Sequence, residues 1–244
     1  MLNRFPVAAV TSVVLLIVPA SAQQTSKPIP RTADGKPDFT GYYNIPYTPN
    51  MALNKESEVP YTERGRAAYV NHDSKDDPTS NCWFPGVPRI MQSPYPSQWV
   101  QTKDTLVILF EYMHTFRSIP LNGRPHPENM ELAFMGDSTG RWEGDTLVVD
   151  TVGLKDAPWT WLDTAGHQHS DAIHVIETFE RTPDNIQFEF TVDDPKMYTK
   201  PWTLKRAITP LKLAPGLPEL LEYNCMENNR DLQHLISTKP ALKP

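Results

Sequence analysis

Residues 173–193 read IHVIETFERTPDNIQFEFTVD, and this stretch decides the fold class. In its second half, apolar side chains occupy every other position: Ile186, Phe188, Phe190 and Val192. Alternation with a period of two is typical of a strand with one buried face. The first half alternates in the same way, and Pro183-Asp184 between the halves favours a chain reversal. The stretch therefore predicts two adjacent antiparallel strands.

Short runs of the same kind recur through most of the chain, rich in Val, Ile, Thr and aromatic residues and separated by turn residues. The predicted strands are Gln98–Thr102, Thr105–Glu111, Met113–Pro120, Thr146–Val152, Ile173–Arg181, Asn185–Asp193, Trp202–Thr209 and Glu219–Cys225. The best helix candidate is short and runs from Thr62 to Tyr69. This series predicts an all-β fold, either a single antiparallel barrel of lipocalin or calycin type or a two-sheet sandwich. We prefer the barrel because closure removes the sheet edges and leaves a mouth that can hold one ligand.

The first 22 residues have the pattern of a cleaved secretory signal. Arg4 precedes an apolar run from Val7 to Val18, and Ala20-Ser21-Ala22 forms a small-residue end. We therefore expect a periplasmic or secreted protein with no membrane attachment after cleavage. Beyond this signal, we expect residues 23–97 to form an extended proline-rich region packed on a barrel formed by residues 98–244.

The charge of the chain argues against nucleic acid as a partner. Without Arg4 the chain has 22 Lys and Arg residues against 29 Asp and Glu residues, which is a net charge of −7. The sequence has no basic cluster that would bind a phosphate backbone. A small organic ligand or substrate is the partner we expect.

Both cysteines, Cys82 and Cys225, lie after the predicted signal. Export would place them in an oxidising compartment, where pairing is favoured. We therefore predict a disulfide that ties the loop around Cys82 to the C-terminal part of the chain. A disulfide also argues against a cysteine nucleophile, which needs a free thiolate.

Candidate site residues concentrate between Trp159 and Arg181. His167 and His169 are two residues apart and would share a face on an extended strand, an arrangement that can bind zinc. A third ligand would come from His174, His114 or His126. A site without a metal is the alternative, in which a carboxylate fixes the tautomer of a histidine and raises its basicity.

The acid–base hypothesis assigns catalysis to histidines, carboxylates and one arginine: His169, His114, Asp163, Asp137, Arg117 and His126. In it, His169 pairs with Asp171 or Asp163, and His114 lies one strand away. A second group of residues is expected to bind the ligand: Arg124, Trp161, Tyr112, Glu177 and His174. Glu177 and Arg181 share a strand face, which would allow an ion pair between them. This hypothesis requires no cofactor, whereas the metal hypothesis requires one divalent ion.

Several segments together resemble an uncharacterised family of exported bacterial β-rich proteins. They are Ala33–Asp38, Pro85–Arg89, Gly123–Pro127, Gly136 through Thr151 and Gly166 through Glu177. The resemblance implies export and a single β-rich domain, and it implies no activity.

Three functions therefore follow from the sequence. The first is an exported lyase, isomerase or hydrolase that transfers protons with His169 and His114. The second is a non-catalytic protein that binds a small apolar or aromatic ligand. The third is a metal-dependent protein that uses His167 and His169.

Overall fold

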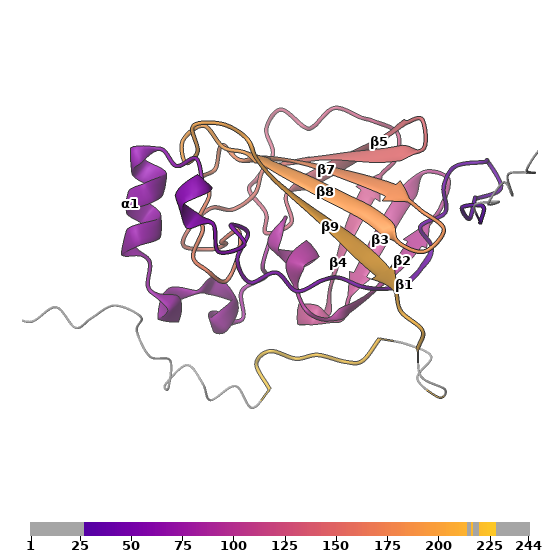
Figure 1. The fold of residues 1–244 in the computed structure, drawn as a ribbon, viewed down its shortest axis with the longest axis horizontal. Helices are drawn as coiled ribbons and strands as arrows, with labels where there is room; N and C mark the ends of the chain where they lie inside the picture. The colour runs from indigo at the N-terminus through magenta and orange to yellow at the C-terminus, as the bar shows by residue number, and fades with distance from the viewer. Residues whose placement is uncertain (1–26, 214–215, 217–219, 228–244) are drawn as a thin grey trace, which may run out of the picture.

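The computed structural model describes residues 27–213, 216 and 220–227, and in this part the fold is nearly all β. Nine antiparallel strands form one sheet in the order β4-β3-β2-β1-β9-β8-β7-β6-β5 (Figure 1). The strands are β1 (Gly41–Asn44), β2 (Pro96–Gln101), β3 (Thr105–Phe110), β4 (Thr115–Pro120), β5 (Asp137–Glu143), β6 (Thr146–Val152), β7 (His174–Arg181), β8 (Ile186–Asp193) and β9 (Trp202–Pro210). The predicted barrel is confirmed, because the edge strands β4 and β5 contact each other and nearly close the sheet.

Alternation of side chains defines the interior of the barrel. In β8 the apolar set from Ile186 to Val192 is buried, and in β7 Val175, Glu177 and Phe179 point inward while Ile176 points outward. The predicted reversal at Pro183-Asp184 is confirmed, and Lys103-Asp104 and Gly144-Asp145 likewise lie between two paired strands. Local alternation thus determines which side chains face the core.

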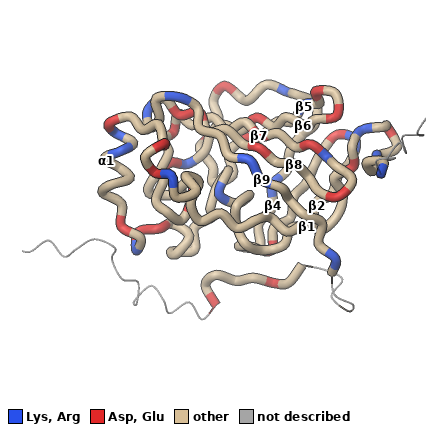
Figure 2. The backbone as a smooth tube through the Cα atoms, in the orientation of Figure 1, with Lys and Arg blue, Asp and Glu red and all other residues tan. Residues whose placement is uncertain are grey.

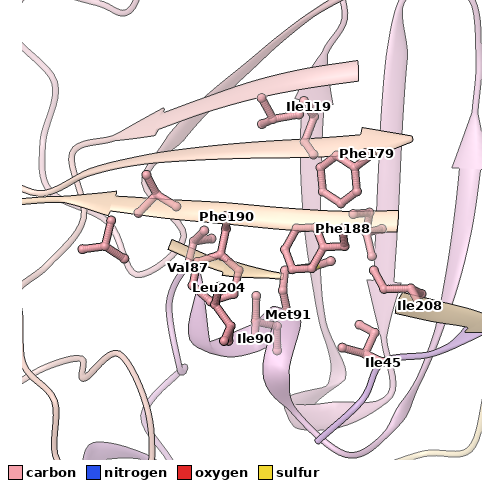
Figure 3. Close-up of a cluster of buried hydrophobic side chains, with 14 of the residues drawn as sticks. Ile45, Val87, Ile90, Met91, Ile119, Phe179, Phe188, Phe190, Leu204 and Ile208 are labelled. Carbon is pink, nitrogen blue, oxygen red and sulfur yellow. The ribbon is translucent and has the colours of Figure 1, made fainter. Parts of the chain in front are cut away.

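One segment of the core comes from a loop. The short 3-10 helix η4 (Arg89–Gln92) places Ile90 and Met91 among Phe188, Phe190 and Leu204 of β8 and β9 (Figure 3). Both loop side chains are at most 1% exposed. Apolar burial therefore anchors the loop from Asp73 to Pro96 in the core. The predicted Cys82–Cys225 disulfide is confirmed, and it ties the same loop to the segment 220–227.

The predicted helix is confirmed as α1 (Glu63–Asn71), which lies at one end of the barrel (Figure 1). Its N-cap is Thr62, whose hydroxyl accepts a hydrogen bond from the Gly65 amide at 3.0 Å. Gly65 packs against the backbone of Met197 so closely that a Cβ would lie 2.0 Å from that carbonyl oxygen. Four more 3-10 segments complete the described elements: η1 (Glu56–Glu58), η2 (Ser74–Asp76), η3 (Pro78–Asn81) and η5 (Tyr112–His114).

The structure differs from the sequence predictions at four places. Residues 41–44 of the N-terminal region form β1 in the middle of the sheet, between β2 and β9. The strand expected from Met113 begins at Thr115, because Met113 and His114 have left-handed backbone conformations. A strand over Asp137–Glu143 was not predicted. The strand predicted over residues 219–225 is wrong for the described residues 220–225, which are irregular.

Acidic and basic residues are intermixed along the backbone (Figure 2). Within the described part of the chain, no helix has the length and apolar character needed to cross a membrane.

Candidate functional site

The best-formed candidate site is a pocket of about 290 Å³ beside η4. Three tyrosine rings cluster in its wall. Tyr95 stacks on Tyr112 with ring centroids 5.4 Å apart. The ring of Tyr223 is tilted against both, with its centroid 5.1 Å from that of Tyr95 and 5.4 Å from that of Tyr112. Tyr223 belongs to the segment 220–227, which Cys225 ties to Cys82. The disulfide therefore holds one wall of this pocket in place.

A buried ion pair forms another part of the wall. The two terminal nitrogens of Arg89 donate to the two carboxylate oxygens of Asp77 at 2.8 and 2.7 Å, and one of them also donates to Thr79 at 2.8 Å. Asp77 additionally caps η3 by accepting from the Thr79 amide. This bidentate geometry engages both terminal nitrogens of the guanidinium and fixes both side chains.

Gln92 follows one turn after Arg89 and also lines the pocket. Its side-chain nitrogen donates to the Leu162 carbonyl at 3.1 Å. Its buried oxygen, Oε1, has no hydrogen-bond partner among the residues that the structure describes. Such an oxygen is an unsatisfied acceptor, because buried polar atoms normally have a partner.

Asp163 joins this pocket to a second cluster of ionisable groups. It lines the pocket, accepts from the Met51 amide at 2.7 Å, and binds Nδ1 of His167 at 2.5 Å. On the other side of the imidazole, Nε2 lies 3.2 Å from both carboxylate oxygens of Glu56, which also accepts from the Tyr61 hydroxyl at 2.5 Å. A chain of contacts thus runs from the pocket to Glu56, whose side chain is 31% exposed.

Electrostatics in this cluster favour a charged imidazole. Burial opposes the charge on His167, but the carboxylates of Asp163 and Glu56 outweigh burial and raise the pKa of His167 above its ordinary value. The ring of Tyr69 stacks on His167 with centroids 4.8 Å apart, and Tyr61 stacks at 6.1 Å. Burial, followed by the charge of Glu56, raises the pKa of Tyr69 to about 12.

His169 does not belong to either cluster. Its Nε2 lies 2.7 Å from the Thr160 hydroxyl, and Nδ1 lies 3.1 Å from the Ser170 carbonyl. The predicted pairing of His169 with Asp171 or Asp163 is wrong: Asp171 is on the surface and pairs with Lys196, and Asp163 pairs with His167. Burial lowers the pKa of His169.

Residues 167–169 lie in an irregular loop, so His167 and His169 do not share a strand face. Each has its own separate set of partners. Among the described residues, no group of three or more His, Cys, Asp or Glu side chains is arranged to hold a metal ion.

Four of the other predicted site residues lie in three further places. Arg117 and Glu177 pair inside the barrel at 2.9 Å, so the expected partnership of Glu177 with Arg181 is replaced by one with Arg117. His114 is exposed and lines a separate pocket with Phe116. Trp161 is buried against the ring of His72 at 5.7 Å.

A surface cluster gathers four of the predicted residues. Asp137 binds Arg124 at 2.5 and 3.0 Å and Nδ1 of His126 at 2.7 Å. Nε2 of His126 lies 3.4 Å from Asp150, which also binds His174. Hydrogen bonding to Arg124 lowers the pKa of Asp137. Of the eleven predicted catalytic and ligand-binding residues, Asp163 and Tyr112 are the two that line the pocket beside η4.

The comparisons with known proteins add no assignment to this geometry. No protein-family profile, no curated protein and no solved structure matches the chain. The case for a function therefore depends on the pocket itself.

Sequence reasoning missed most of the pocket. Arg89 ends the proline- and glycine-rich run Pro85–Arg89, and a charged residue in such a rigid loop was the available signal. Tyr95 and Tyr112 flank the predicted strands Gln98–Thr102 and Thr105–Glu111, so a hairpin register was the available signal for that pair, whereas no local spacing connects Tyr223 to them.

Proposed function

We propose that this protein binds a small organic molecule in the pocket beside η4. The observation that carries the proposal is the convergence of three tyrosine rings, a buried ion pair and several hydroxyl side chains on one cavity of about 290 Å³. This volume lies just below the range typical of ligand sites, which is roughly 300–1,000 Å³. The tyrosine rings provide the aromatic surface common in such sites, whereas most of the remaining lining side chains are polar.

We further propose that the protein acts after export, in the periplasm or outside the cell. The signal-like pattern of residues 1–22 supports this location, although those residues lie outside the described part of the chain. The Cys82–Cys225 bond is compatible with an oxidising compartment.

Acid–base catalysis in the same pocket is the second candidate function. It is favoured by the position of Asp163, which lines the pocket and binds His167 at 2.5 Å. In this proposal Asp163 exchanges a proton with the bound substrate. His167, which lies between Asp163 and Glu56, balances the negative charge of the two carboxylates. A lyase, isomerase or hydrolase could use such a carboxylate.

The test of binding is ligand-detected NMR with a mixed library of small carboxylates, amines, phenols and polyols. Tyr223→Ala removes one wall of the pocket from a segment outside the sheet, and Phe116→Ala is the matched control at a 62% exposed ring. We expect at least one compound to show saturation transfer that Tyr223→Ala abolishes and Phe116→Ala preserves. A library without any such compound would overturn the proposal.

The catalytic candidate is tested on whichever compound binds. Asp163→Asn keeps the size of the side chain and removes its basicity. Loss of turnover with binding retained supports catalysis, whereas binding without turnover in the wild-type protein contradicts it.

A further inference from the structure

We infer that the ligand class of the pocket is a neutral, polyhydroxylated ring, that is, a sugar or a cyclitol. This inference rests on the proposed function. Thirteen of the fourteen lining residues carry a polar side-chain group, nine of them a hydroxyl, and Pro94 is the exception. No Leu, Ile, Val, Met or Phe lines the pocket. An apolar ligand would leave these polar groups desolvated and unpaired, which is unfavourable.

The charges in the wall are already compensated. Arg89 uses both terminal nitrogens on Asp77 and Thr79, at 2.7–2.8 Å. Asp163 accepts from the Met51 amide at 2.7 Å and from His167. An anionic ligand would meet the carboxylates of Asp77 and Asp163, and the terminal nitrogens of Arg89 are already bound to Asp77. A cationic ligand would compete with Arg89 for Asp77 and with His167 for Asp163. A neutral ligand avoids both costs.

The unsatisfied acceptor on Gln92 suits a ligand hydroxyl. Gln92 lines the pocket, and its Oε1 has no partner among the described residues, but that oxygen is closed to solvent. In the proposed complex the Gln92 side chain turns toward the cavity, so that a ligand hydroxyl donates to Oε1 and accepts from a tyrosine or threonine hydroxyl in the same wall. A ring that carries several hydroxyls can make such pairs on more than one side.

The tyrosine cluster provides the flat surface that a sugar ring requires. Tyr95 and Tyr112 stack with an interplanar angle of 9°, and Tyr223 is tilted by 50–57° against them. Tyrosine combines an apolar ring with a polar tip, so it packs against C–H groups while its hydroxyl binds a neighbouring oxygen. A phenol would stack equally well, but it brings one hydroxyl to a wall that contains nine.

The experiment compares three ligand classes on the full chain. The neutral probes are D-glucose, D-galactose, D-xylose and myo-inositol, and the competing probes are p-cresol and benzoate, each at millimolar concentration in saturation-transfer NMR. We expect at least one neutral probe to bind, with affinity lowered about tenfold by Tyr223→Ala and by Gln92→Met. Phe116→Ala should leave the affinity unchanged.

The outcomes separate the ligand class from the proposed function. Binding of p-cresol or benzoate that Tyr223→Ala abolishes, with no neutral probe bound, overturns the sugar or cyclitol class and leaves small-molecule binding intact. Neutral probes whose binding Tyr223→Ala and Gln92→Met both leave unchanged overturn the assignment to this pocket. A protein that binds none of the six probes, and no member of the broader library, overturns both proposals.

Discussion

Arg117 of β4 and Glu177 of β7 form an ion pair inside the barrel, with Nη1 of the arginine 2.9 Å from Oε1 of the glutamate. The same guanidinium donates to Ser138 of β5 at 3.1 Å and to Thr151 of β6 at 2.9 Å. Because β4 and β5 are the two edges of the sheet, Arg117 connects one edge to three strands at the other. The Gly123 amide, just after β4, donates to the Gly140 carbonyl of β5 at 2.9 Å and supports the same closure.

Breaking this pair should destabilise the barrel strongly. Arg117→Met leaves the Glu177 carboxylate buried at 0% exposure without its counter-charge, and we expect the free energy of unfolding to fall by about 3–5 kcal/mol. The double variant Arg117→Met/Glu177→Leu removes both charges and should recover most of that loss. Chemical denaturation of the three proteins measures these differences.

An exposed pair provides the control for this prediction. Arg141 binds Glu143 on the surface, with both side chains more than half exposed. Arg141→Met should change the free energy of unfolding by less than about 1 kcal/mol, because water screens such pairs. A double variant as unstable as Arg117→Met would contradict the assignment of the loss to an uncompensated charge.

The disulfide should stabilise the fold and hold the pocket wall. Cys82 and Cys225 are 143 residues apart, so in the chain-entropy model their bond contributes about 4–5 kcal/mol. In Cys82→Ser/Cys225→Ser we expect a lower melting temperature. We also expect faster amide hydrogen exchange in residues 220–227, where the Leu221 amide binds Glu111 at 3.1 Å.

The comparison with the oxidised wild-type protein isolates this effect. Exchange in β7 and β8 should keep its relative protection, since the bond does not touch those strands. Unchanged protection of residues 220–227 in the serine variant would show that their side chains alone hold the segment.

The stability contribution of His167 should depend on pH in a defined direction. Its pKa is raised in the folded protein, so the imidazolium between Asp163 and Glu56 contributes stability that is fully present below the unfolded pKa of about 6.5. That contribution is lost as the pH rises through the folded pKa. The difference in unfolding free energy between wild type and His167→Gln should therefore be largest below about pH 6.5 and decrease at higher pH.

His114→Gln controls for the general loss of an imidazole, because His114 is exposed and lies outside this cluster. A difference for His167→Gln that increases with pH would mean that the neutral ring, rather than the charged one, is stabilised.

The sequence predicted the barrel well because its signals are local. Two such signals are the alternation in Ile186–Asp193 and the turn residues Pro183-Asp184, each of which acts within a few residues. Both predict what the structure shows, a half-buried strand and a reversal between β7 and β8. The strand β5 gave no such signal, since its buried residues Ser138, Thr139 and Gly140 are small and polar. Ser138 is buried because its hydroxyl accepts from Arg117 at the seam, and Gly140 is buried because it packs against Ile119 and Leu121.

The pocket could not be predicted in the same way. Tyr95 and Tyr112 lie opposite each other at the end of the β2–β3 hairpin, but Tyr223 reaches them from a segment more than 100 residues later in the chain, which the disulfide ties to Cys82. The sequence placed Asp163 and His167 in one candidate stretch but paired Asp163 with His169, whereas the spacing of four residues lets the loop bring Asp163 to His167. It gave no reason to separate His167 from His169, because partner choice depends on which carboxylates and hydroxyls the folded loop presents.

His169 illustrates this point, and its replacement should affect folding rather than the pocket. His169 is 3% exposed, and both ring nitrogens have partners, Thr160 and the Ser170 carbonyl. His169→Ala leaves a cavity and removes both contacts, so we expect the free energy of unfolding to fall by about 2–4 kcal/mol. His169→Gln retains one hydrogen-bonding group and should lose less. Binding of a pocket ligand by either variant, measured well below its melting temperature, should match the wild type. Selective loss of ligand turnover in both variants, with normal stability, would restore His169 to a catalytic role.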